Sequence, residues 1–509
     1  MGQFSAFLRG SHLTTNTYSQ NWYLFAIIFF SFIQILLTSA PLFGYSSLLV
    51  IFKRMDLYHQ LCPNSNSTSA NSTMYTSTDY DICETQEAAL DLPFAFGAFL
   101  HNAVKVVIGH CIDRYGSRLC NLTGCLFLIM FGFLLAEVHQ GAEYLLYPAF
   151  FVLAVSSSFL MLCPYQIVNI MVKRNKAFYI CILSGSVDSS TVVFYLFLKL
   201  FERGIPLADI SLGFIFLCGS MVLLSTIILY PSREILQAEL DATQYCKLKP
   251  TGLNKKLIDY ERKGRADFPL EHFEAGIPDD SCNKHDNNKW NESPLARASL
   301  RECLFSWFNI FLIYQVSITM LILWYFIANI DKYLGYITDQ STASEYIKTF
   351  GLIQFCGLAV GPLTGAIFIA FNRSAGNENQ FLTKIKSLNI TSLLLFILTT
   401  AFLLILLLQK LSYSIVVFSL FFLCNGLLWC YLSTFYAYVF PPQHYCTLYG
   451  FAMVCCGLVS FLQFPLLVLE QKSFGGNMFN VDLIFLVLHT STIVLPINMC
   501  VFYINTVNK

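Results

Sequence analysis

The residues best placed to do chemistry in this chain are ionisable side chains inside long apolar runs. Asp188 lies near the centre of the run from Ala177 to Leu200. A carboxyl group in the middle of a bilayer costs several kcal/mol unless it faces a water-filled cavity or a polar partner. Asp188 is therefore our first candidate for contact with a polar solute. The alternative is a structural acid that hydrogen-bonds Ser or Thr hydroxyls across a helix interface.

A second ionisable side chain, Lys105, lies in the run from Leu92 to Cys111, about two helical turns before Asp113. We expect its ammonium group to extend along the helix toward the membrane surface near Asp113, as long basic side chains commonly do. The alternative is a pairing with a buried acid such as Asp188. That pairing would place a cation beside the solute path and favour an anionic or zwitterionic solute.

Single amide side chains occur in five apolar runs, at Asn102, Gln315, Gln354, Asn425 and Gln463. An amide donates and accepts hydrogen bonds and so suits a flat heterocycle, but the same groups also join neighbouring helices. Aromatic rings can stack on a planar solute. We take Asp188 and Gln463 as the primary solute contacts or gate residues. The weaker candidates are Gln354, Asn425, Asn102, Tyr45 and Phe464.

A charged motif separates the second and third apolar runs, with Gly109, Asp113, Arg114, Gly116 and Arg118 in the spacing Gly-x3-Asp-Arg-x-Gly-x-Arg. Gly109 permits close helix approach and Gly116 a tight turn. The acid and the two arginines suit charge-assisted contacts at a helix end. The spacing resembles the cytoplasmic signature of the major facilitator superfamily, which latches that side in one conformation. The alternative is a generic charged turn.

Motifs for other kinds of chemistry are absent from the sequence. It contains no Gly-x4-Gly-Lys-Ser/Thr loop for ATP, and no His-Glu-x-x-His or Gly-x-Ser-x-Gly motif of a hydrolase. We therefore expect no enzyme activity, no cofactor and no metal. A formal net charge of zero argues against nucleic-acid binding. Deep acids are few, essentially Asp188 alone, which favours facilitated diffusion over a proton relay.

Membrane-spanning helices must position these residues. Charged residues make up 12% of the chain, against about 25% in soluble domains, and hydrophobic residues make up 56%. We count twelve apolar runs, long enough to cross a core of roughly 30 Å. They are Trp22–Leu42, Leu92–Cys111, Leu122–Ala136, Tyr144–Pro164, Ala177–Leu200, Ile210–Tyr230, Leu304–Ala328, Tyr346–Phe371, Ile390–Leu408, Ser414–Tyr436, Thr447–Leu469 and Val481–Tyr503. The predicted fold is an all-α polytopic membrane protein.

A hydrophilic segment divides the runs into two groups of six. Two such halves joined by a linker are typical of internally repeated transporters. The composition of the segment is that of a solvated, largely flexible linker. The expected parts are a cytoplasmic N-terminus (1–21), an N-terminal half (22–230), a cytoplasmic linker (231–303), a C-terminal half (304–503) and a cytoplasmic C-terminus (504–509).

The loop after the first run indicates which face is external. It holds Cys62 and Cys83, candidates for a disulfide, and glycosylation sequons at Asn66 and Asn71. A disulfide and N-linked glycans are both compatible with an extracellular or lumenal face. Basic residues gather in loops on the opposite side, which favours a cytoplasmic position for those loops. We expect cytoplasmic termini and a multi-pass protein of the plasma membrane; an internal membrane would give the same pattern.

Several stretches resemble solute carrier family 43, in both halves and in collinear order. They are Phe43–Leu49, Cys62–Pro63, Asp188–Ser190, Phe440–Pro441 and Leu462–Pro465. Known members are equilibrative nucleobase transporters and large neutral amino acid transporters. Asp188 and Phe464 are similar to the nucleobase branch, whereas Lys105 stands where a small polar residue would be expected. The resemblance implies a twelve-helix major facilitator fold and transport by alternating access.

We therefore expect sodium-independent, facilitative transport of purine nucleobases. The protein would act as a monomer in the lipid bilayer, with a small-molecule solute as its partner. Large neutral amino acids are the alternative substrates. A non-transporting receptor or scaffold that docks partners on the 231–303 linker is an alternative of another class, and it would bind a ligand without net flux.

Overall fold

The computed structural model describes residues 17–62, 84–248, 293–295, 297–354, 357–373, 380–474 and 478–507. All regular elements in these ranges are helices. Within them, nine helices are long and apolar enough to cross a membrane, and two bent helix pairs raise the number to 11. A shorter apolar helix, Leu358–Phe371, falls within the eighth predicted run. The predicted all-α polytopic fold is confirmed.

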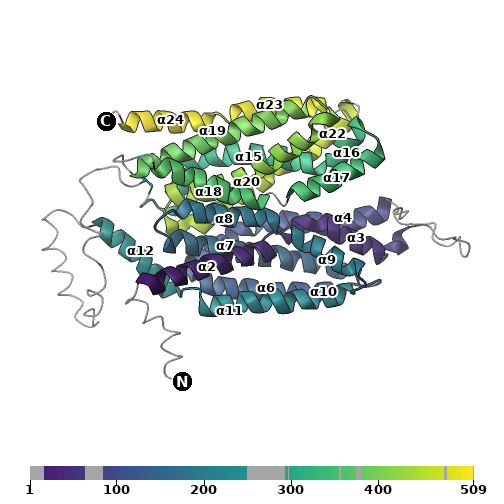
Figure 1. Cartoon of the computed structure of the whole chain (residues 1–509), viewed down its shortest axis with the longest axis horizontal. Helices are drawn as coiled ribbons and strands as arrows, with labels where there is room; N and C mark the ends of the chain where they lie inside the picture. Colours follow the sequence, from purple (N-terminus) through teal and green to yellow (C-terminus); the bar gives the residue numbers. More distant parts are fainter. Residues whose placement is uncertain are drawn as a thin grey trace, which may run out of the picture.

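The helices form two bundles that lie side by side (Figure 1). The N-terminal bundle contains α2 (Thr17–Thr38), α3 (Tyr45–Arg54), α4 (Glu84–Ala103), α5 (Lys105–Tyr115), α6 (Ser117–Ala136), α7 (Leu146–Met171), α8 (Lys176–Ser189), α9 (Val192–Glu202), α10 (Leu207–Phe214) and α11 (Ser220–Ile228). The C-terminal bundle contains α15 (Trp307–Ala328), α16 (Ile330–Ile337), α17 (Gln340–Gln354), α18 (Gly357–Arg373), α19 (Gln380–Leu406), α20 (Ser414–Val439), α21 (Tyr445–Ser460), α22 (Gln463–Ser473), α23 (Phe479–Ser491) and α24 (Val494–Val507).

The first two spans are bent where the sequence shows one apolar run each. Trp22–Thr38 meets Pro41–Arg54 at 43°, and Ala89–Ala103 meets Lys105–Tyr115 at 40°. In the first span a 3-10 helix begins at Pro41, because proline cannot continue the hydrogen bonding of the preceding helix. The bends divide each span into two pieces with different packing partners: α5 packs mainly on α21 and α4 mainly on α7.

The segment expected to be a largely flexible linker begins with a helix. Residues Arg233–Leu248 form α12, which packs against α7. Its Leu236 is buried, and Glu239 pairs with Lys173 at 3.0 Å. The expectation is therefore wrong for this stretch, because one apolar face is enough to dock a polar helix on the bundle. Residues 249–292 lie outside the described part of the chain.

A short helix, α14 (Leu300–Leu304), precedes the C-terminal bundle and begins with a capping box. The Ser299 hydroxyl accepts a hydrogen bond from the Glu302 backbone N–H, and the Glu302 carboxylate accepts one from the Ser299 backbone N–H. These hydrogen bonds hold the pKa of Glu302 below its usual value. The cap fixes the point at which the chain enters the second bundle.

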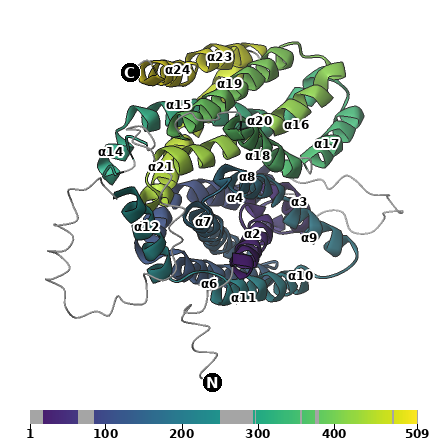
Figure 2. The same ribbon diagram turned by 60° about the vertical axis from the view of Figure 1, so that its left-hand side comes forward.

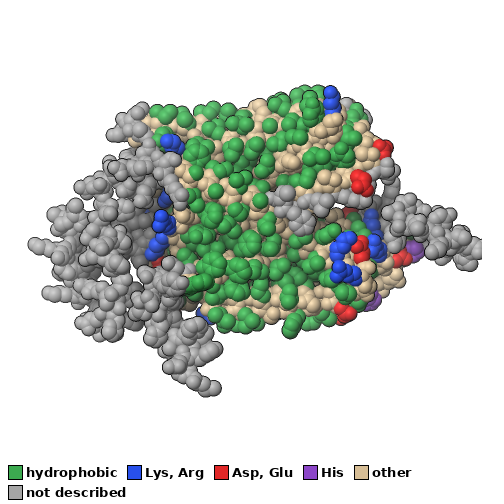
Figure 3. All heavy atoms as spheres, in the orientation of Figure 1, with side chains coloured by type: hydrophobic (Ala, Val, Ile, Leu, Met, Phe, Trp, Pro, Cys, Tyr) green, Lys and Arg blue, Asp and Glu red, His purple; other side chains and the backbone are tan. Residues whose placement is uncertain are grey.

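Side-chain types on the surface are distributed as a bilayer requires. In Figure 3 hydrophobic side chains cover the middle of the visible face, and the charged side chains gather at its two ends. Large exposed apolar residues include Leu126, Phe133, Phe216, Ile397 and Val487. A band of this kind would aggregate in water, but it matches the hydrocarbon core of a membrane.

The two bundles pack against each other chiefly through α5 with α21, and α8 with α18 and α20. Figure 2 shows α8 and α18 next to each other at the boundary between the bundles. These contacts concentrate toward the end of the molecule that holds the C-terminus of α5 and the N-termini of α6, α8 and α21. We call this the Asp113 end, and the opposite end, which holds Cys62, the Cys62 end. The bundles are thus joined at the Asp113 end.

Glycines allow this close packing. A Cβ atom at Gly361 of α18 would collide with the carbonyl oxygen of Cys181 on α8. Likewise, a Cβ at Gly109 of α5 would collide with the Cys446 carbonyl of α21, and one at Gly450 with the Lys105 carbonyl. Small residues at such crossings let two helix backbones approach each other, as in many membrane bundles.

Substitution Gly361→Val is expected to force α8 and α18 apart and to prevent closure of the Asp113 end. The thiol of Cys181, which is fully buried beside this crossing, should then react with a maleimide. Peptide mapping of the labelled protein measures this reaction. The control is Gly213→Val, because an added Cβ at Gly213 meets nothing within 4 Å. Unchanged protection of Cys181 in the Gly361 variant would contradict the packing argument.

Candidate solute path between the two bundles

A carboxyl–amide pair joins the two bundles near the middle of the molecule. Asp188 lies on α8 and Asn425 on α20, two helices that pack together, and the amide of Asn425 lies close enough to the Asp188 carboxyl group to interact with it. Both residues are only partly buried, although they lie inside membrane-spanning helices that pack together. Together they offer hydrogen-bond acceptors and an amide donor at one place. Of the candidates suggested by the sequence, these two are brought together across the interface.

Below this pair, toward the Asp113 end, a layer of small polar groups closes the interface. The Ser184 hydroxyl of α8 lies 2.8 Å from the Ser433 hydroxyl of α20, and the Tyr165 hydroxyl of α7 donates to Ser184 at 2.9 Å. The Cys430 thiol of α20 donates to the Cys181 carbonyl at 3.6 Å. The residues in this layer are buried, so in this conformation a solute beside Asp188 has no open route to the Asp113 end.

Lys105 does not extend to the surface as the sequence suggested. It is 2% exposed, and its ammonium group points back one helical turn to the Asn102 side-chain oxygen, at 3.5 Å. The close packing of α5 on α21 blocks the route along the helix toward Asp113. Within the described residues no ion pair neutralises this ammonium group, and Asn102 of the candidate set is its hydrogen-bond partner.

The carboxylate of Asp113 binds the first turn of α21 in the opposite bundle. It accepts hydrogen bonds from the backbone N–H groups of Cys446 at 3.3 Å and Thr447 at 2.8 Å, and from the Thr447 hydroxyl at 2.6 Å. The Gln166 amide of α7 donates a fourth, at 3.3 Å. The first N–H groups of a helix have no partner within the helix and carry partial positive charge. Asp113 therefore caps α21 across the bundle interface.

Gly109 of the motif also lies against α21, at the Cys446 carbonyl, and the remaining members make no contact with the other bundle among the described residues. Arg118 donates to the Ile227 carbonyl at the end of α11, at 2.7 Å. Gly116 has φ +91°, which disfavours residues with side chains. Arg114 is exposed and lies over the ring of Tyr115. The motif thus combines contacts between the bundles, made by Asp113 and Gly109, with a turn that is held from within one bundle.

A family model described as Major Facilitator Superfamily matches residues 65–463. The chain belongs to this superfamily. It is 24% identical to "Equilibrative nucleobase transporter 1" of Bos taurus, over 89% of this chain and 91% of that protein. It is 23% identical to "Large neutral amino acids transporter small subunit 3" of Mus musculus, over 94% and 93% of the two chains. "Protein FMP42" of Saccharomyces cerevisiae is 22% identical, over 92% of each chain.

Solved structures show the same fold for this major facilitator protein. The proton:xylose symporter XylE matches with a TM-score of 0.56 and 11% identity, over 95% of this chain and 96% of XylE. The human organic anion transporter MFSD10 (TETRAN) matches with a TM-score of 0.54 and 12% identity, over 92% and 99% of the two chains. These structures show the fold, and the family match with the relatives above indicates a membrane transporter of the major facilitator type.

Two aromatic candidates lie in different surroundings. Tyr45 is 4% exposed in the core of the N-terminal bundle; its ring stacks on Phe94 at 4.7 Å, and its hydroxyl donates to the Leu90 carbonyl at 2.5 Å. It has no free face for a solute in this conformation. Phe464 at the start of α22 is more than half exposed and stacks beside Phe461, which in turn contacts Phe99 of the other bundle at 5.4 Å.

The remaining candidates are placed only in part. Gln463 is the first residue of α22 and is partly buried. Gln354 ends α17, and its side chain lies outside the described residues. Cys62 is disulfide-bonded, but its expected partner Cys83 lies outside the described residues, as do the sequons at Asn66 and Asn71. The pairing and the glycans remain predictions.

Sequence reasoning missed polar clusters that hold each bundle together. Gln34 donates to Asn121 at 2.8 Å, and Asn121 donates to Thr226 at 2.6 Å, all buried in the N-terminal bundle. In the C-terminal bundle the Ser392 hydroxyl donates to Gln315 at 2.9 Å, which makes Gln315 a helix-joining residue. A polar residue inside an apolar run was the available signal, but it does not reveal which bundle face the residue occupies.

Two further buried carboxyl groups, Glu470 and Asp482, were also missed. They are 2% and 4% exposed, so Asp188 is not the only acid that the helices enclose, although these two lie at the ends of apolar runs and Asp188 lies near the centre of one. The predicted runs ended at Leu469 and began at Val481, directly beside the two acids. A hydropathy pattern assigns such positions to the surface, whereas here the packing of α22 and α23 covers them.

Proposed function

We propose that the chain is a sodium-independent, facilitative transporter of purine nucleobases. The observation that carries the proposal is the Asp188–Asn425 pair, a carboxyl group and an amide that lie close together on packed helices of the two bundles. A purine presents ring N–H donors and ring nitrogen acceptors on one plane, and this pair offers the complementary groups. The similarity over most of the chain to a protein named as a nucleobase transporter supports the same solute.

Transport would proceed by rocking of the two bundles around this pair. In this conformation the bundles are latched at the Asp113 end by Asp113 and by the α8–α18 crossing. Breaking those contacts and forming new ones at the Cys62 end would expose the solute to the other side. We place the Asp113 end and both termini in the cytoplasm of a plasma-membrane protein that works as a monomer, with the Cys62 end outside.

The experiment that tests the proposal is uptake of radiolabelled adenine by cells that express the chain at the surface. We expect saturable uptake that is unchanged when sodium is replaced by choline. Vesicles that reach equal adenine concentrations on both sides, without accumulation beyond them, would identify facilitated flux. Adenine binding with no net flux in vesicles would instead favour a receptor.

Transport of large neutral amino acids is a second candidate, and Lys105 favours it. The Lys105 ammonium group is buried near the boundary of the bundles, and its one hydrogen bond within the described residues, to Asn102, is long. A free amino acid carries a carboxylate that such a cation would bind, and Asp188 would suit the amino group. Leucine uptake without adenine uptake in the same cells would select this candidate.

A further inference from the structure

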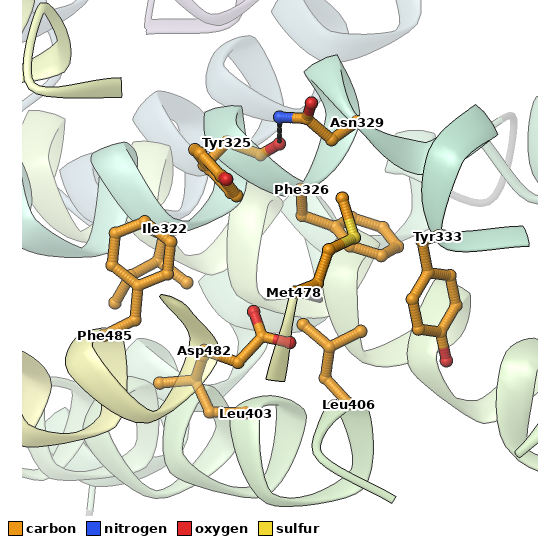
Figure 4. Close-up of a pocket in the computed structure, with 10 residues that line it drawn as sticks. All are labelled: Ile322, Tyr325, Phe326, Asn329, Tyr333, Leu403, Leu406, Met478, Asp482 and Phe485. Atoms are coloured by element: carbon orange, nitrogen blue, oxygen red, sulfur yellow. Dashed lines mark hydrogen bonds between the residues drawn. The ribbon is translucent and has the colours of Figure 1, made fainter. Parts of the chain in front are cut away.

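A small cavity lies inside the C-terminal bundle toward the Cys62 end, apart from the contacts between the bundles. It is lined by side chains of α15, α16, α19 and α23, and its polar lining residues include Tyr325, Asn329 and Asp482 (Figure 4). The remaining lining is aliphatic and aromatic. The space open to the centre of a water-sized sphere is about 10 Å³, which is the room of about one water molecule.

The Asp482 carboxyl group points into this cavity (Figure 4). It is 4% exposed, and among the described residues no side chain or backbone N–H donates a hydrogen bond to it. Glu470 on α22 is close enough to act on Asp482 electrostatically and is itself buried. Glu470 accepts a hydrogen bond from the Tyr325 hydroxyl. Two buried acids thus share one neighbourhood, and one of them has no donor.

Basic groups do not neutralise this pair in the described part of the chain. Lys332 of α16 is exposed and donates to the Asn329 side chain at 3.3 Å. Lys410 and Lys472 are exposed near the ends of α19 and α22. The ring of His489 on α23 faces Phe396 of α19. The other titratable groups near the cavity are the hydroxyls of Tyr325 and Tyr333, and they carry no positive charge.

Two negative charges in these surroundings would be unstable. An unpaired buried charge costs several kcal/mol, and a second like charge nearby adds to that cost. Asp482 lies in the first turn of α23, where the helix dipole favours a carboxylate by about 1 kcal/mol. The helix dipole stabilises the carboxylate by less than the burial of an unpaired charge costs. The pair must therefore bind a positive charge. A metal ion needs several oxygen ligands, whereas most of this lining is apolar and the space is that of one water molecule.

We propose that Glu470 and Asp482 form a proton-binding site that holds one proton in this conformation. Glu470 already accepts a hydrogen bond from the Tyr325 hydroxyl, whereas Asp482 has no donor among the described residues, so Asp482 is the acid that carries the proton. Asn329 also lines the cavity, and its side chain accepts a hydrogen bond from Lys332. Because the site is separate from the contacts between the bundles, proton binding there does not depend on which solute the protein carries.

Infrared difference spectroscopy of the purified protein tests the site without any solute. We expect a protonated-carboxyl C=O band at neutral pH that is lost in Asp482→Asn and retained in Asp209→Asn, a change at an exposed acid of α10. A band of equal size in the wild type and in Asp482→Asn would overturn the proposal. So would loss of the wild-type band when sodium replaces potassium at constant pH, because the site would then bind a metal ion.

Two further variants keep the test decisive if Asp482→Asn does not fold. Asp482→Glu keeps a carboxyl group and should show a band at a shifted frequency. Glu470→Gln removes the neighbouring charge, so the Asp482 band should disappear at a lower pH than in the wild type. An unshifted band in both variants would assign the proton elsewhere and reject the site. Neither result depends on adenine or leucine flux, so this proposal and the proposed function fail separately.

Discussion

Replacing Asp113 by alanine is expected to release α21 from the N-terminal bundle and to expose the Cys446 thiol. The substitution removes the acceptor of four hydrogen bonds, three of which come from the first turn of α21. Loss of one partner of a buried, charge-assisted contact costs roughly 2–5 kcal/mol. The Cys446 thiol reacts only when the bundles separate at this end. The lost stabilisation should therefore make maleimide labelling of Cys446 on the order of 100-fold faster.

Labelling with peptide mapping measures this change, because Cys446 is fully buried at the interface. The matched control is Arg114→Ala, which removes the adjacent charge but no contact with α21; its labelling rate should equal that of the wild type. Cys424 is buried in the core of the C-terminal bundle, and it reports unfolding. Equal labelling of Cys446 in the wild type and in Asp113→Ala would contradict the latch.

The isosteric substitution Asp188→Asn is expected to lower adenine uptake by at least about tenfold. It keeps the shape of the side chain but removes a charged acceptor, and hydrogen bonds to charged groups contribute about 1.5–3 kcal/mol. Initial uptake rates, normalised to protein at the cell surface, measure the effect. The control is Asp209→Asn, the same chemical change at an exposed position of α10.

Asn425→Ala should lower uptake to a similar extent, and the double variant should lose little more than either single one. Residues that act as one unit are strongly non-additive, whereas distant sites add within a few tenths of a kcal/mol. Additive losses would show that Asp188 and Asn425 act separately. Full activity of Asp188→Asn, in protein that reaches the surface, would remove Asp188 from the solute path.

These expectations rest on contacts that are far apart in the sequence. Asp113 and Thr447 are separated by 334 residues. Nothing in the sequence around Asp113 indicates which helix it caps. The motif predicted a latch of charged groups, and in the structure Asp113 is the charged member that hydrogen-bonds the other bundle. The two arginines were predicted to take part in the same latch. In the structure Arg118 binds a carbonyl group of its own bundle, and Arg114 is exposed beside Tyr115.

The sequence by itself determined the fold class, the apolar spans and the mid-span position of Asp188, because hydropathy and spacing are local properties. Only the tertiary structure decided which way Lys105 points, that Tyr45 is enclosed, and that Asp188 meets Asn425. It also brought Glu470 and Asp482 together from the ends of two runs. A side chain's partners depend on how helices distant in sequence pack, and many packings satisfy one hydropathy pattern.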